Sequence, residues 1–510
     1  MLSPALFLGV DESCATQDCA FTLSRQDREV GRSGEVKMRR LSLLCLCLTT
    51  TIAAGCAPRP TIDAAASIPS RSGLLYLYLQ PLPREADGLR AEIGSVAALA
   101  ADGVSHPLNL ENSVIDGTAP KRQRLLSAGP LPAGTYRGIL VTAASARLVA
   151  PRGAGDLRVS DAPRLTEASF TVAEGRATLL TLRLQGEAAI VEGYAFEPTF
   201  SAGQSSATGL APGATAVATV TDAAVLVVFH KLSGEVFDVL RTERGPRGTA
   251  YDSGRDRAYV ACADADVVEA FDLARSAREQ ALPLLLGDQP AGLALARDGR
   301  TIVVANTGSN TVTVLNAPQL EERFRVPVGR EPVTVLLDPD ERRALVVQRG
   351  SNAVSIVDLA SGALVGSFAT EEGPVFAAFA RDGRRLFVIH RDSPNILLVD
   401  FGTLQIERRV YVGVGATAIA VDPVTDRVYL ARRGTGQIEV FDPASLLPIE
   451  TVRIGADVAF LDIDDESEQL LAAIPKARES RAIRLSGGAT SAVTDLGGNP
   501  AWIDVAGGDR

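Results

Sequence analysis

The sequence predicts an all-β protein with two domains, and three observations support this. From residue 245 to residue 510 a unit recurs every 42 residues. Inside each unit, short β-branched runs alternate with turn dipeptides, and helical periodicity is absent. Upstream, alternating strands appear without a repeat. A period near 40 to 45 residues with several short strands per unit is typical of a propeller blade. We therefore expect an N-terminal β-sandwich followed by a seven-bladed β-propeller.

The repeat has two landmarks. The start of the unit recurs at Gly245, Gly287, Gly329, Glu371, Gly413, Gly455 and Gly497, at steps of 42 residues. A polar residue that ends an apolar run recurs at Asn316, Asp358, Asp400 and Asp442, again 42 apart, whereas Asp272 is two residues out of phase. Because both landmarks recur at the same interval, the 42-residue unit is expected to be a repeated structural element.

The unit 287–328 shows four predicted strands. They cover residues 291–296, 301–305, 311–315 and 322–328. The dipeptides Asp298-Gly299 and Ser309-Asn310 separate them, at positions where tight hairpins need residues that tolerate a positive φ. Each unit is thus expected to be one small antiparallel sheet.

Counting units predicts how the ring closes. Six complete units cover residues 245–496, and a seventh start at 497–500 is followed by one strand, 501–506. The missing strands lie upstream, since the apolar run 225–230 precedes the run 267–272 by 42 residues. We expect residues 212–244 to supply the outer three strands of a blade whose innermost strand is the C-terminal segment, which leaves few free edges.

These residues resemble the YVTN β-propeller repeat, whose consensus is Tyr-Val-Thr-Asn, a turn, then Asn-Thr-Val-Ser-Val-Ile-Asp. The matching segments are 258–261, 303–306 with 309–312, and 351–358, preceded by a Gly-x-x-Pro element at 287–290 and 329–332. The unit 455–496 departs most, because it lacks the proline. The resemblance implies the fold over about 300 residues and leaves the function open, since propellers host unrelated activities.

Composition limits the classes of partner. The chain has 510 residues, an apolar fraction of 46% and a net charge of −10. This length predicts more than one domain with real cores. The acidic balance gives no support for binding nucleic acid or an anionic membrane through bulk electrostatics.

Residues 38–55 are predicted to be a lipoprotein signal peptide. Met38 opens a basic segment, an apolar stretch too short to span a bilayer follows, and small residues precede Cys56. This resembles a lipobox, which implies lipidation of Cys56 and anchoring of the chain in a membrane through its N-terminal lipid. Residues 1–37 are interpreted as a mis-assigned leader, with translation starting at Met38.

The remaining domain boundaries follow from composition. Residues 56–72 form a polar tether, and Ala57 after the lipidated cysteine resembles lipoproteins sent to the outer membrane. Residues 73–201 predict a sandwich of roughly seven strands, similar to Ig-like and transthyretin-like domains. Residues 202–211 are the linker, and residues 212–510 the propeller. Cys262 is then the one cysteine of the folded part, so neither a disulfide framework nor a thiolate site is expected.

The sequence offers little for catalysis. There is no Gly-x-Ser-x-Gly, no Walker A loop and no dinucleotide fingerprint. The three histidines, His106, His230 and His390, fall in different structural units, so no metal site and no cofactor is expected. Trp502, a lone tryptophan in the closing strand, is interpreted as core rather than as a platform for sugar.

One group of residues stands out. At the turn between the second and third strands, positions 42 apart carry Asn306, Gln348, His390 and Arg432, and the residues that follow include Arg349, Arg391 and Arg433. Three adjacent blades would then present Arg349, His390, Arg391, Arg432 and Arg433 on the face where propeller ligands enter. Guanidinium groups pair bidentately with anions. The alternative is independent solvated turns whose arginines pair with nearby Asp or Glu.

Two functions remain open. The first is a non-enzymatic envelope lipoprotein whose propeller binds a partner protein or an anionic surface polymer. The second is a hydrolase, similar to propeller lactonases, that acts through His390, Arg391 and Arg349 on an anionic ester. An enzyme needs an acid, a base and a cation that converge. No carboxylate partner is evident in the sequence, which favours the first function.

The lipid anchor is directly testable. Cells that express the chain in the presence of radiolabelled palmitate are expected to yield a labelled protein, because acylation at Cys56 adds fatty acid to the mature N-terminus. Absence of label on the wild-type protein would contradict the anchor.

Overall fold

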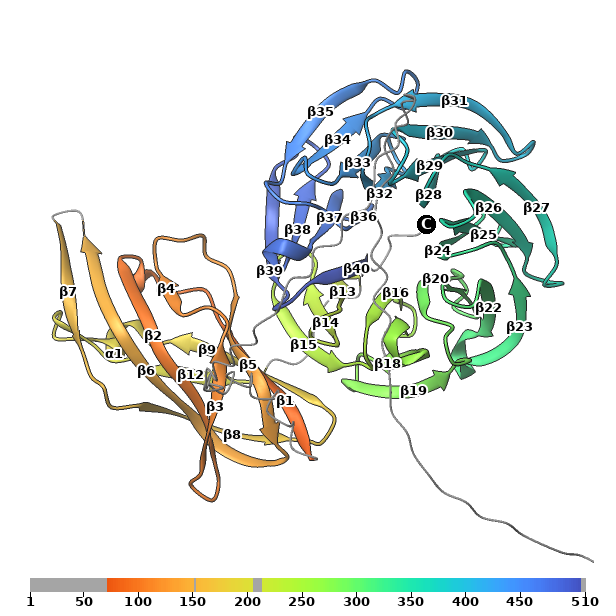
Figure 1. The fold of residues 1–510 in the computed structure, drawn as a ribbon. Coiled ribbons are helices and arrows are strands. Elements are labelled where there is room, and N and C mark those ends of the chain that lie inside the picture. Colours follow the sequence, from red (N-terminus) through yellow and green to blue (C-terminus); the bar gives the residue numbers. More distant parts are fainter. Residues whose placement is uncertain (1–70, 151–152, 205–212, 506–510) are drawn as a thin grey trace, which may run out of the picture. The chain divides into compact units, whose positions relative to one another are not determined.

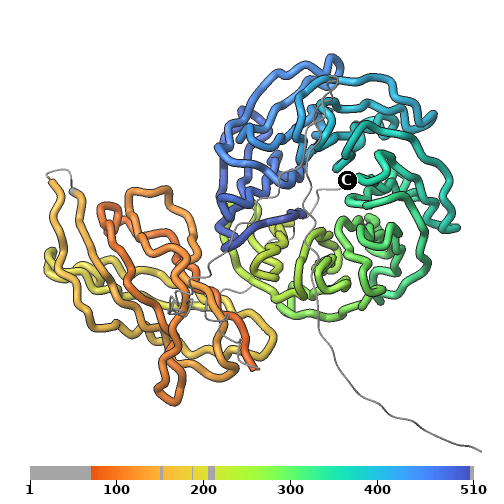
Figure 2. The backbone as a smooth tube through the Cα atoms, in the orientation of Figure 1, coloured from red at the N-terminus to blue at the C-terminus, as the bar shows by residue number. Residues whose placement is uncertain are grey.

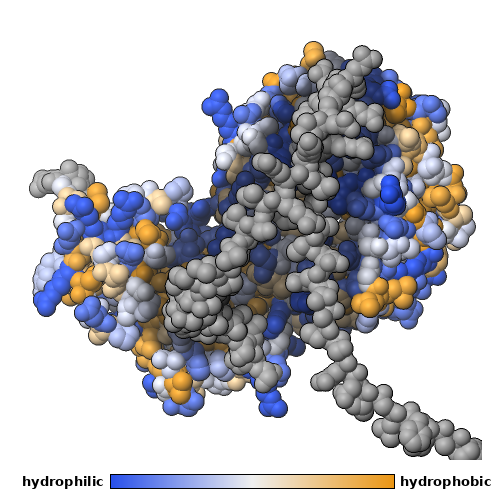
Figure 3. Space-filling model, viewed as in Figure 1, coloured by the Kyte–Doolittle hydropathy of each residue, from blue (hydrophilic) through white to orange (hydrophobic). Residues whose placement is uncertain are grey.

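The computed structural model describes residues 71–150, 153–204 and 213–505, all within one compact unit. The leader 1–37, the signal peptide, Cys56 and the predicted tether up to residue 70 lie outside these residues, whereas Ser72, the last residue of the predicted tether, begins β1. Within them, no helix has the length and hydropathy needed to span a bilayer. Polar and apolar side chains are interspersed over the face that Figure 3 shows outside the grey atoms.

The N-terminal domain is an all-β sandwich with more strands than the sequence predicted. Ten of its twelve strands form one hydrogen-bonded path, in which β1 pairs antiparallel with β5 and parallel with β9. The other two lie off this path, where β4 pairs with β2 and β8 pairs with β6. Very short strands such as β10, β11 and β12 carry no alternation, which explains the low count from the sequence. The strands are β1 Ser72–Leu79, β2 Leu89–Ala100, β3 Ser105–Leu110, β4 Val114–Asp116, β5 Arg124–Pro132, β6 Gly134–Ala150, β7 Gly153–Val159, β8 Arg164–Val172, β9 Ala177–Leu184, β10 Ile190–Val191, β11 Ala195–Phe196 and β12 Phe200–Gly203, with one short helix, α1 Gly186–Ala189.

The propeller consists of seven four-stranded sheets around a common centre (Figure 1). From the innermost strand outward, three blades are β16 Pro246–Asp252, β17 Arg257–Cys262, β18 Val267–Asp272 and β19 Ala277–Pro283; β20 Pro290–Leu295, β21 Thr301–Asn306, β22 Thr311–Asn316 and β23 Glu321–Pro327; and β24 Pro332–Leu337, β25 Arg343–Gln348, β26 Ala353–Asp358 and β27 Leu364–Ala369. Three more are β28 Pro374–Phe379, β29 Arg385–His390, β30 Asn395–Asp400 and β31 Gln405–Tyr411; β32 Ala416–Val421, β33 Val428–Arg432, β34 Gln437–Phe441 and β35 Pro448–Arg453; and β36 Phe460–Asp464, β37 Gln469–Ile474, β38 Glu479–Arg484 and β39 Thr490–Asp495. The seventh joins β40 Pro500–Val505 to β13 Thr215–Val220, β14 Val225–His230 and β15 Val236–Arg241.

The structure corrects one step of the repeat. The inner strands β16 and β20 begin at Pro246 and Pro290, which are 44 residues apart, whereas Pro290 and Pro332 are 42 apart. The two additional residues lie in the connection 284–289, which is longer than the corresponding connection 328–331. This explains why Asp272 is out of phase with the later landmarks.

The Ser-Asn turns link neighbouring blades. Asn310 and Asn352 adopt φ values of 59° and 52°, in the left-handed region that Asn tolerates. The side-chain oxygen of Asn310 accepts a hydrogen bond from the Glu331 backbone N–H at 2.9 Å, and that of Asn352 accepts one from Gly373 at 2.9 Å. Each turn thereby holds the connection that leads into the next blade.

The two ends of the propeller share one blade, as the sequence predicted. β40 pairs antiparallel with β13, with Trp502 opposite Thr219, and Figure 2 shows the C-terminal end of the described chain beside the start of the propeller. The neighbouring inner strands are also linked to β40. The Tyr251 N–H donates to Asp504 Oδ2 at 2.7 Å, and the Val505 N–H donates to Asp462 Oδ2 at 3.2 Å.

Aromatic side chains fill the centre of the ring. Phe460 stacks on Trp502 with ring centroids 4.1 Å apart, and Phe376 lies 5.3 Å from Trp502 and 5.4 Å from Phe460. Because β32 separates β28 from β36, the contact between Phe376 and Phe460 crosses the middle of the ring. The seven inner strands carry at this level, in chain order, Gly248, Gly292, Thr334, Phe376, Ala418, Phe460 and Trp502.

On the inner strands β16 and β20, the position that corresponds to Trp502 of β40 needs a residue without a side chain. A Cβ on Gly248 would overlap the Ala291 carbonyl oxygen, and one on Gly292 would lie 2.8 Å from the Val333 carbonyl oxygen. Adjacent inner strands therefore approach closely there. Trp502 is part of the packed interior, which agrees with its interpretation as core.

The two domains share polar contacts around Asp495. The Leu125 N–H donates to Asp495 Oδ2 at 3.1 Å, and the Tyr78 hydroxyl donates to the Asp495 backbone oxygen at 3.0 Å. Burial raises the pKa of the Asp495 carboxyl, although the hydrogen bonds that it accepts from the Leu125 and Gly497 N–H groups oppose the rise. The side-chain amide of Gln123 also forms hydrogen bonds with both the backbone N–H and the backbone carbonyl of Val236. These two groups at the edge of β15 are therefore hydrogen-bonded, although no further strand of the described residues pairs with that edge.

The closure predicts a stability effect. Ile503 lies in β40 and is fully buried, so Ile503→Ala is expected to lower the free energy of unfolding by about 2 to 5 kcal/mol. Urea denaturation followed by circular dichroism would measure this. The control is Val365→Ala, at a side chain of the outer strand β27 that is 56% exposed, for which a change below about 0.5 kcal/mol is expected. Equal effects of the two substitutions would contradict the role of β40.

Candidate functional site

The residues singled out at the ends of the second strands lie inside the blades. Asn306, Gln348 and His390 are the last residues of β21, β25 and β29, and all three are buried. Arg432 ends β33 and makes two hydrogen bonds to Glu439, at 2.9 and 3.0 Å. These side chains therefore complete the polar interior beneath the turns and do not lie on the surface.

His390 is a neutral, enclosed imidazole. Its Nδ1 lies 3.0 Å from the Asn395 carbonyl oxygen, which can only accept, so Nδ1 carries the proton. Burial lowers the pKa of His390, although the hydrogen bond to Asn395 and the charge of Glu371 oppose the shift. The Nε2 atom has no hydrogen-bond partner in the part of the chain that the structure describes.

Glu371 is the carboxylate whose charge acts on His390, but it makes its hydrogen bonds to other residues. Its carboxylate accepts hydrogen bonds from Ser393 Oγ and, at 2.9 Å, from Asn395 Nδ2, and it lies 3.2 Å from Arg409 Nε. Burial alone would raise the pKa of Glu371, but the hydrogen bonds from Ser393 and Asn395 and the charge of Arg409 lower it. The group is therefore an ionised carboxylate that fixes the turn.

Three of the predicted arginines remain at the surface, and their charges lower the pKa of the same carboxylate, Asp392. They are Arg349, Arg391 and Arg433. They follow the second strands of three consecutive blades. Arg391 is hydrogen-bonded to Asp392 at 2.9 and 3.0 Å, and this bond lowers the pKa of the Asp392 carboxyl, as do the charges of Arg391, Arg349 and Arg433. Arg349 also pairs with Glu331 at 3.0 Å. The structure thus brings together three of the five predicted residues, around Asp392.

Two exposed side chains that sequence reasoning missed lie at the connection 412–415: Tyr411 ends β31, and Val414 lies within the connection. Tyr411 is 77% exposed and Val414 is 61% exposed. The Gly415 N–H donates to the Arg391 carbonyl oxygen at 2.9 Å, and the Arg433 N–H donates to the Gly415 carbonyl oxygen at 2.7 Å. The connection that carries Val414 therefore lies between the turns of Arg391 and Arg433. We call Arg349, Arg391, Arg433, Tyr411 and Val414 the Arg–Tyr surface.

The backbone of this connection is fixed. Gly413 and Gly415 have φ values of 90° and 88°, which a residue with a Cβ rarely adopts. The N–H groups of Val412 and Gly413 both donate to the Pro394 carbonyl oxygen, at 2.8 and 3.0 Å. In the sequence, Gly413-Val414-Gly415 could have indicated this connection, because two glycines that flank an apolar residue favour a defined loop with positive φ angles.

Other candidate groups in the part of the chain that the structure describes are engaged or do not gather into a metal site. Cys262 is buried, with Sγ 3.3 Å from Glu269 Oε2, and burial raises the pKa of its thiol well above the usual range. Among residues 71–150, 153–204 and 213–505, no group of three or more His, Cys, Asp or Glu side chains could hold a metal ion.

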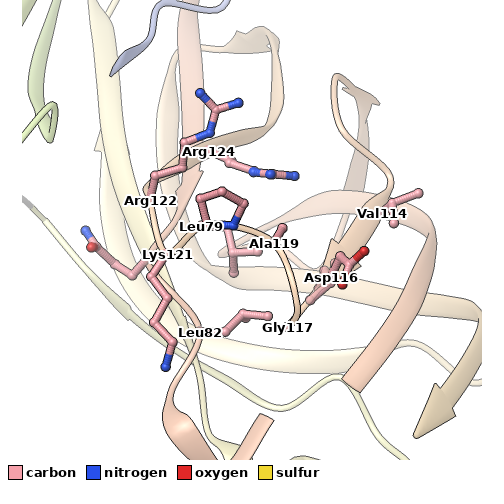
Figure 4. Close-up of a pocket in the computed structure, with 12 residues that line it drawn as sticks. Leu79, Leu82, Val114, Asp116, Gly117, Ala119, Lys121, Arg122 and Arg124 are labelled. Carbon is pink, nitrogen blue, oxygen red and sulfur yellow. The ribbon is translucent and has the colours of Figure 1, made fainter. Parts of the chain in front are cut away.

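A pocket in the sandwich domain holds about 30 Å³, which suits a water molecule rather than a substrate (Figure 4). Charged side chains that line it already have partners. Lys121 lies 2.7 Å from Asp87, Asp116 lies 3.2 Å from Arg90, and Arg122 lies 3.0 Å from Glu479.

Parts of this chain are similar to known proteins. Residues 236–423 match the family model described as a YNCE-like beta-propeller. Among solved structures, the hydrazine synthase of Kuenenia stuttgartiensis is 17% identical, with 54% of this chain and 93% of that chain covered and a TM-score of 0.49. None of the curated proteins matches the chain. The family match over residues 236–423 and the seven blades confirm the resemblance to YVTN-type propellers seen in the sequence.

The burial of His390 predicts a pH dependence of stability. Because the folded state lowers the pKa of His390, the unfolded chain binds the proton more tightly, and the free energy of unfolding falls as the pH drops below about 6.5. His390→Gln, which copies Gln348 of the neighbouring blade, is expected to reduce this slope by at most about 1.4 kcal/mol per pH unit. Urea denaturation at pH 7.5 and pH 5.0 would measure the difference. Equal slopes in the variant and the wild type would exclude His390 as the titrating group.

Proposed function

We propose that the protein is a non-catalytic binding protein of the cell envelope, held at the outer membrane by a lipid on Cys56, whose propeller holds an anionic group of a partner on the Arg–Tyr surface. The observation that carries the proposal is the convergence of Arg349, Arg391 and Arg433 on Asp392. Three cations on a rigid scaffold, beside an exposed tyrosine, form the kind of surface that recognises carboxylates.

Rigidity supports this role. The arginines are on turns whose backbones are bonded to the connections between blades, as in the Arg391 N–H that donates to the Gly373 carbonyl oxygen at 2.8 Å. A preorganised surface loses less conformational entropy on binding than a mobile one. The same scaffold fixes the distance between the arginines, which gives specificity for the shape of the partner.

The hydrolase alternative is supported less well. His390, the base that it requires, is fully buried, and its charged neighbour Glu371 is committed to Ser393, Asn395 and Arg409. The centre of the ring carries small and aromatic side chains at the level of Trp502. An acid, a base and a cation therefore do not converge on a place that a substrate can reach.

A triple substitution tests the binding role. Arg349→Ala, Arg391→Ala and Arg433→Ala together are expected to weaken retention of the envelope partner at least about tenfold, because together they remove all three cations of the surface. The measurement is a pull-down from detergent-solubilised envelopes, with each bound component compared between the wild type and the variant.

The chain supplies a matched control. Arg300, Arg342 and Arg384 are exposed, 42 residues apart, and lie in the turns between the first and second strands, at the opposite end of the blades. Their triple change to Ala removes the same charge and is expected to leave retention unchanged. If the Arg349, Arg391 and Arg433 variant still retained every component, the surface would have no role in binding.

A further inference from the structure

The Arg–Tyr surface has less free positive charge than its three arginines suggest. Arg349 pairs with Glu331 at 3.0 Å, and Arg391 pairs with Asp392 at 2.9 Å. Both carboxylates are solvent-accessible, with side chains 48% and 40% exposed. Any ligand that lies across the surface therefore meets two negative groups as well as the arginines.

Arg433 differs from the other two. It is exposed, and among the residues that the structure describes no carboxylate lies within 4.0 Å of its guanidinium. Its charge acts on Asp392 from a greater distance. The surface thus has about one cation that is ready to form a new ion pair.

This charge distribution disfavours a polyanion. A polymer with a negative group on every unit gains affinity where it meets a row of unpaired cations, and it is repelled by carboxylates in the same row. Here Glu331 and Asp392 are interleaved with Arg349 and Arg391. A ligand with one anionic group, placed at Arg433, avoids that repulsion.

Val414 lies beside this cation, and Tyr411 ends the strand that leads into the same connection. Tyr411 and Val414 are largely exposed, and Val414 is one residue from Gly415, whose carbonyl oxygen accepts the Arg433 N–H. Tyrosine and arginine are the residue types that contribute most at protein interfaces. A partner that covers the tyrosine ring and the valine with apolar groups gains affinity from the burial of that surface.

From these observations we infer that the Arg–Tyr surface binds a protein segment in which a single carboxylate lies beside one or two apolar side chains. The carboxylate pairs with Arg433, and the apolar side chains cover Tyr411 and Val414. The inference rests on the proposed function and specifies the partner's chemistry: a protein segment rather than an anionic surface polymer.

The test uses the full chain in detergent and two probes, a phage-displayed library of random dodecapeptides and soluble polygalacturonate. The selected peptides are expected to share an Asp, a Glu or a terminal carboxylate next to apolar residues. The best of them, made synthetically, is expected to bind at least tenfold more weakly to Tyr411→Ser and to Arg433→Gln. Both residues are exposed, so folding is retained. Arg342→Gln, at the opposite end of the blade, is expected to change its affinity less than twofold.

Other outcomes overturn the inference in distinguishable ways. Binding of polygalacturonate that requires Arg349, Arg391 and Arg433, with no selected peptide, would keep the proposed function and replace the protein segment with a polymer. Selected peptides with runs of acidic residues, unaffected by Tyr411→Ser, would also contradict the inference. If neither probe bound, the inference would be wrong, and the envelope pull-down alone would decide the proposed function.

Discussion

The pairing of β40 with β13 is the constraint on which the rest of the propeller depends. A four-stranded sheet cannot bury both faces alone, so each blade needs a neighbour on each side, and the first and last blades obtain theirs only if the ring closes. Sharing one blade between both ends of the propeller region achieves this without a free edge. The fixed angle between consecutive blades then sets where Arg349, Arg391 and Arg433 lie.

The second strands show how a repeat diversifies without losing its geometry. One position carries Asn306, Gln348, His390 and Arg432 in successive blades, and the side chain is accommodated differently in each blade. Asn306 donates to Thr313 at 2.7 Å, His390 to the Asn395 carbonyl oxygen, and Arg432 to Glu439. The backbone accepts an amide, an imidazole or a guanidinium there because the partner changes with the residue.

The fold was largely predictable, because register and turn chemistry are local. The unit 287–328 gave its four strands within a residue or two, and the shared blade followed from counting. Local patterns could not show that His390 points inward, since alternation on a strand does not distinguish an interior polar position from a turn. Nor could they show Tyr411 and Val414, whose significance comes from the hydrogen bonds of Gly415 to two turns.

The unequal filling of the centre also bears on how such a ring can evolve. Phe376, Phe460 and Trp502 occupy the middle, whereas Gly248 and Gly292 leave no room for a side chain. Blades that arose as copies have thus become specialised by position. Exchanging two of them by recombination would bring a bulky ring against a crowded backbone, or leave a void where a ring had been. The order of the blades is consequently constrained by side chains at the axis, and the closure of the ring by the shared strand.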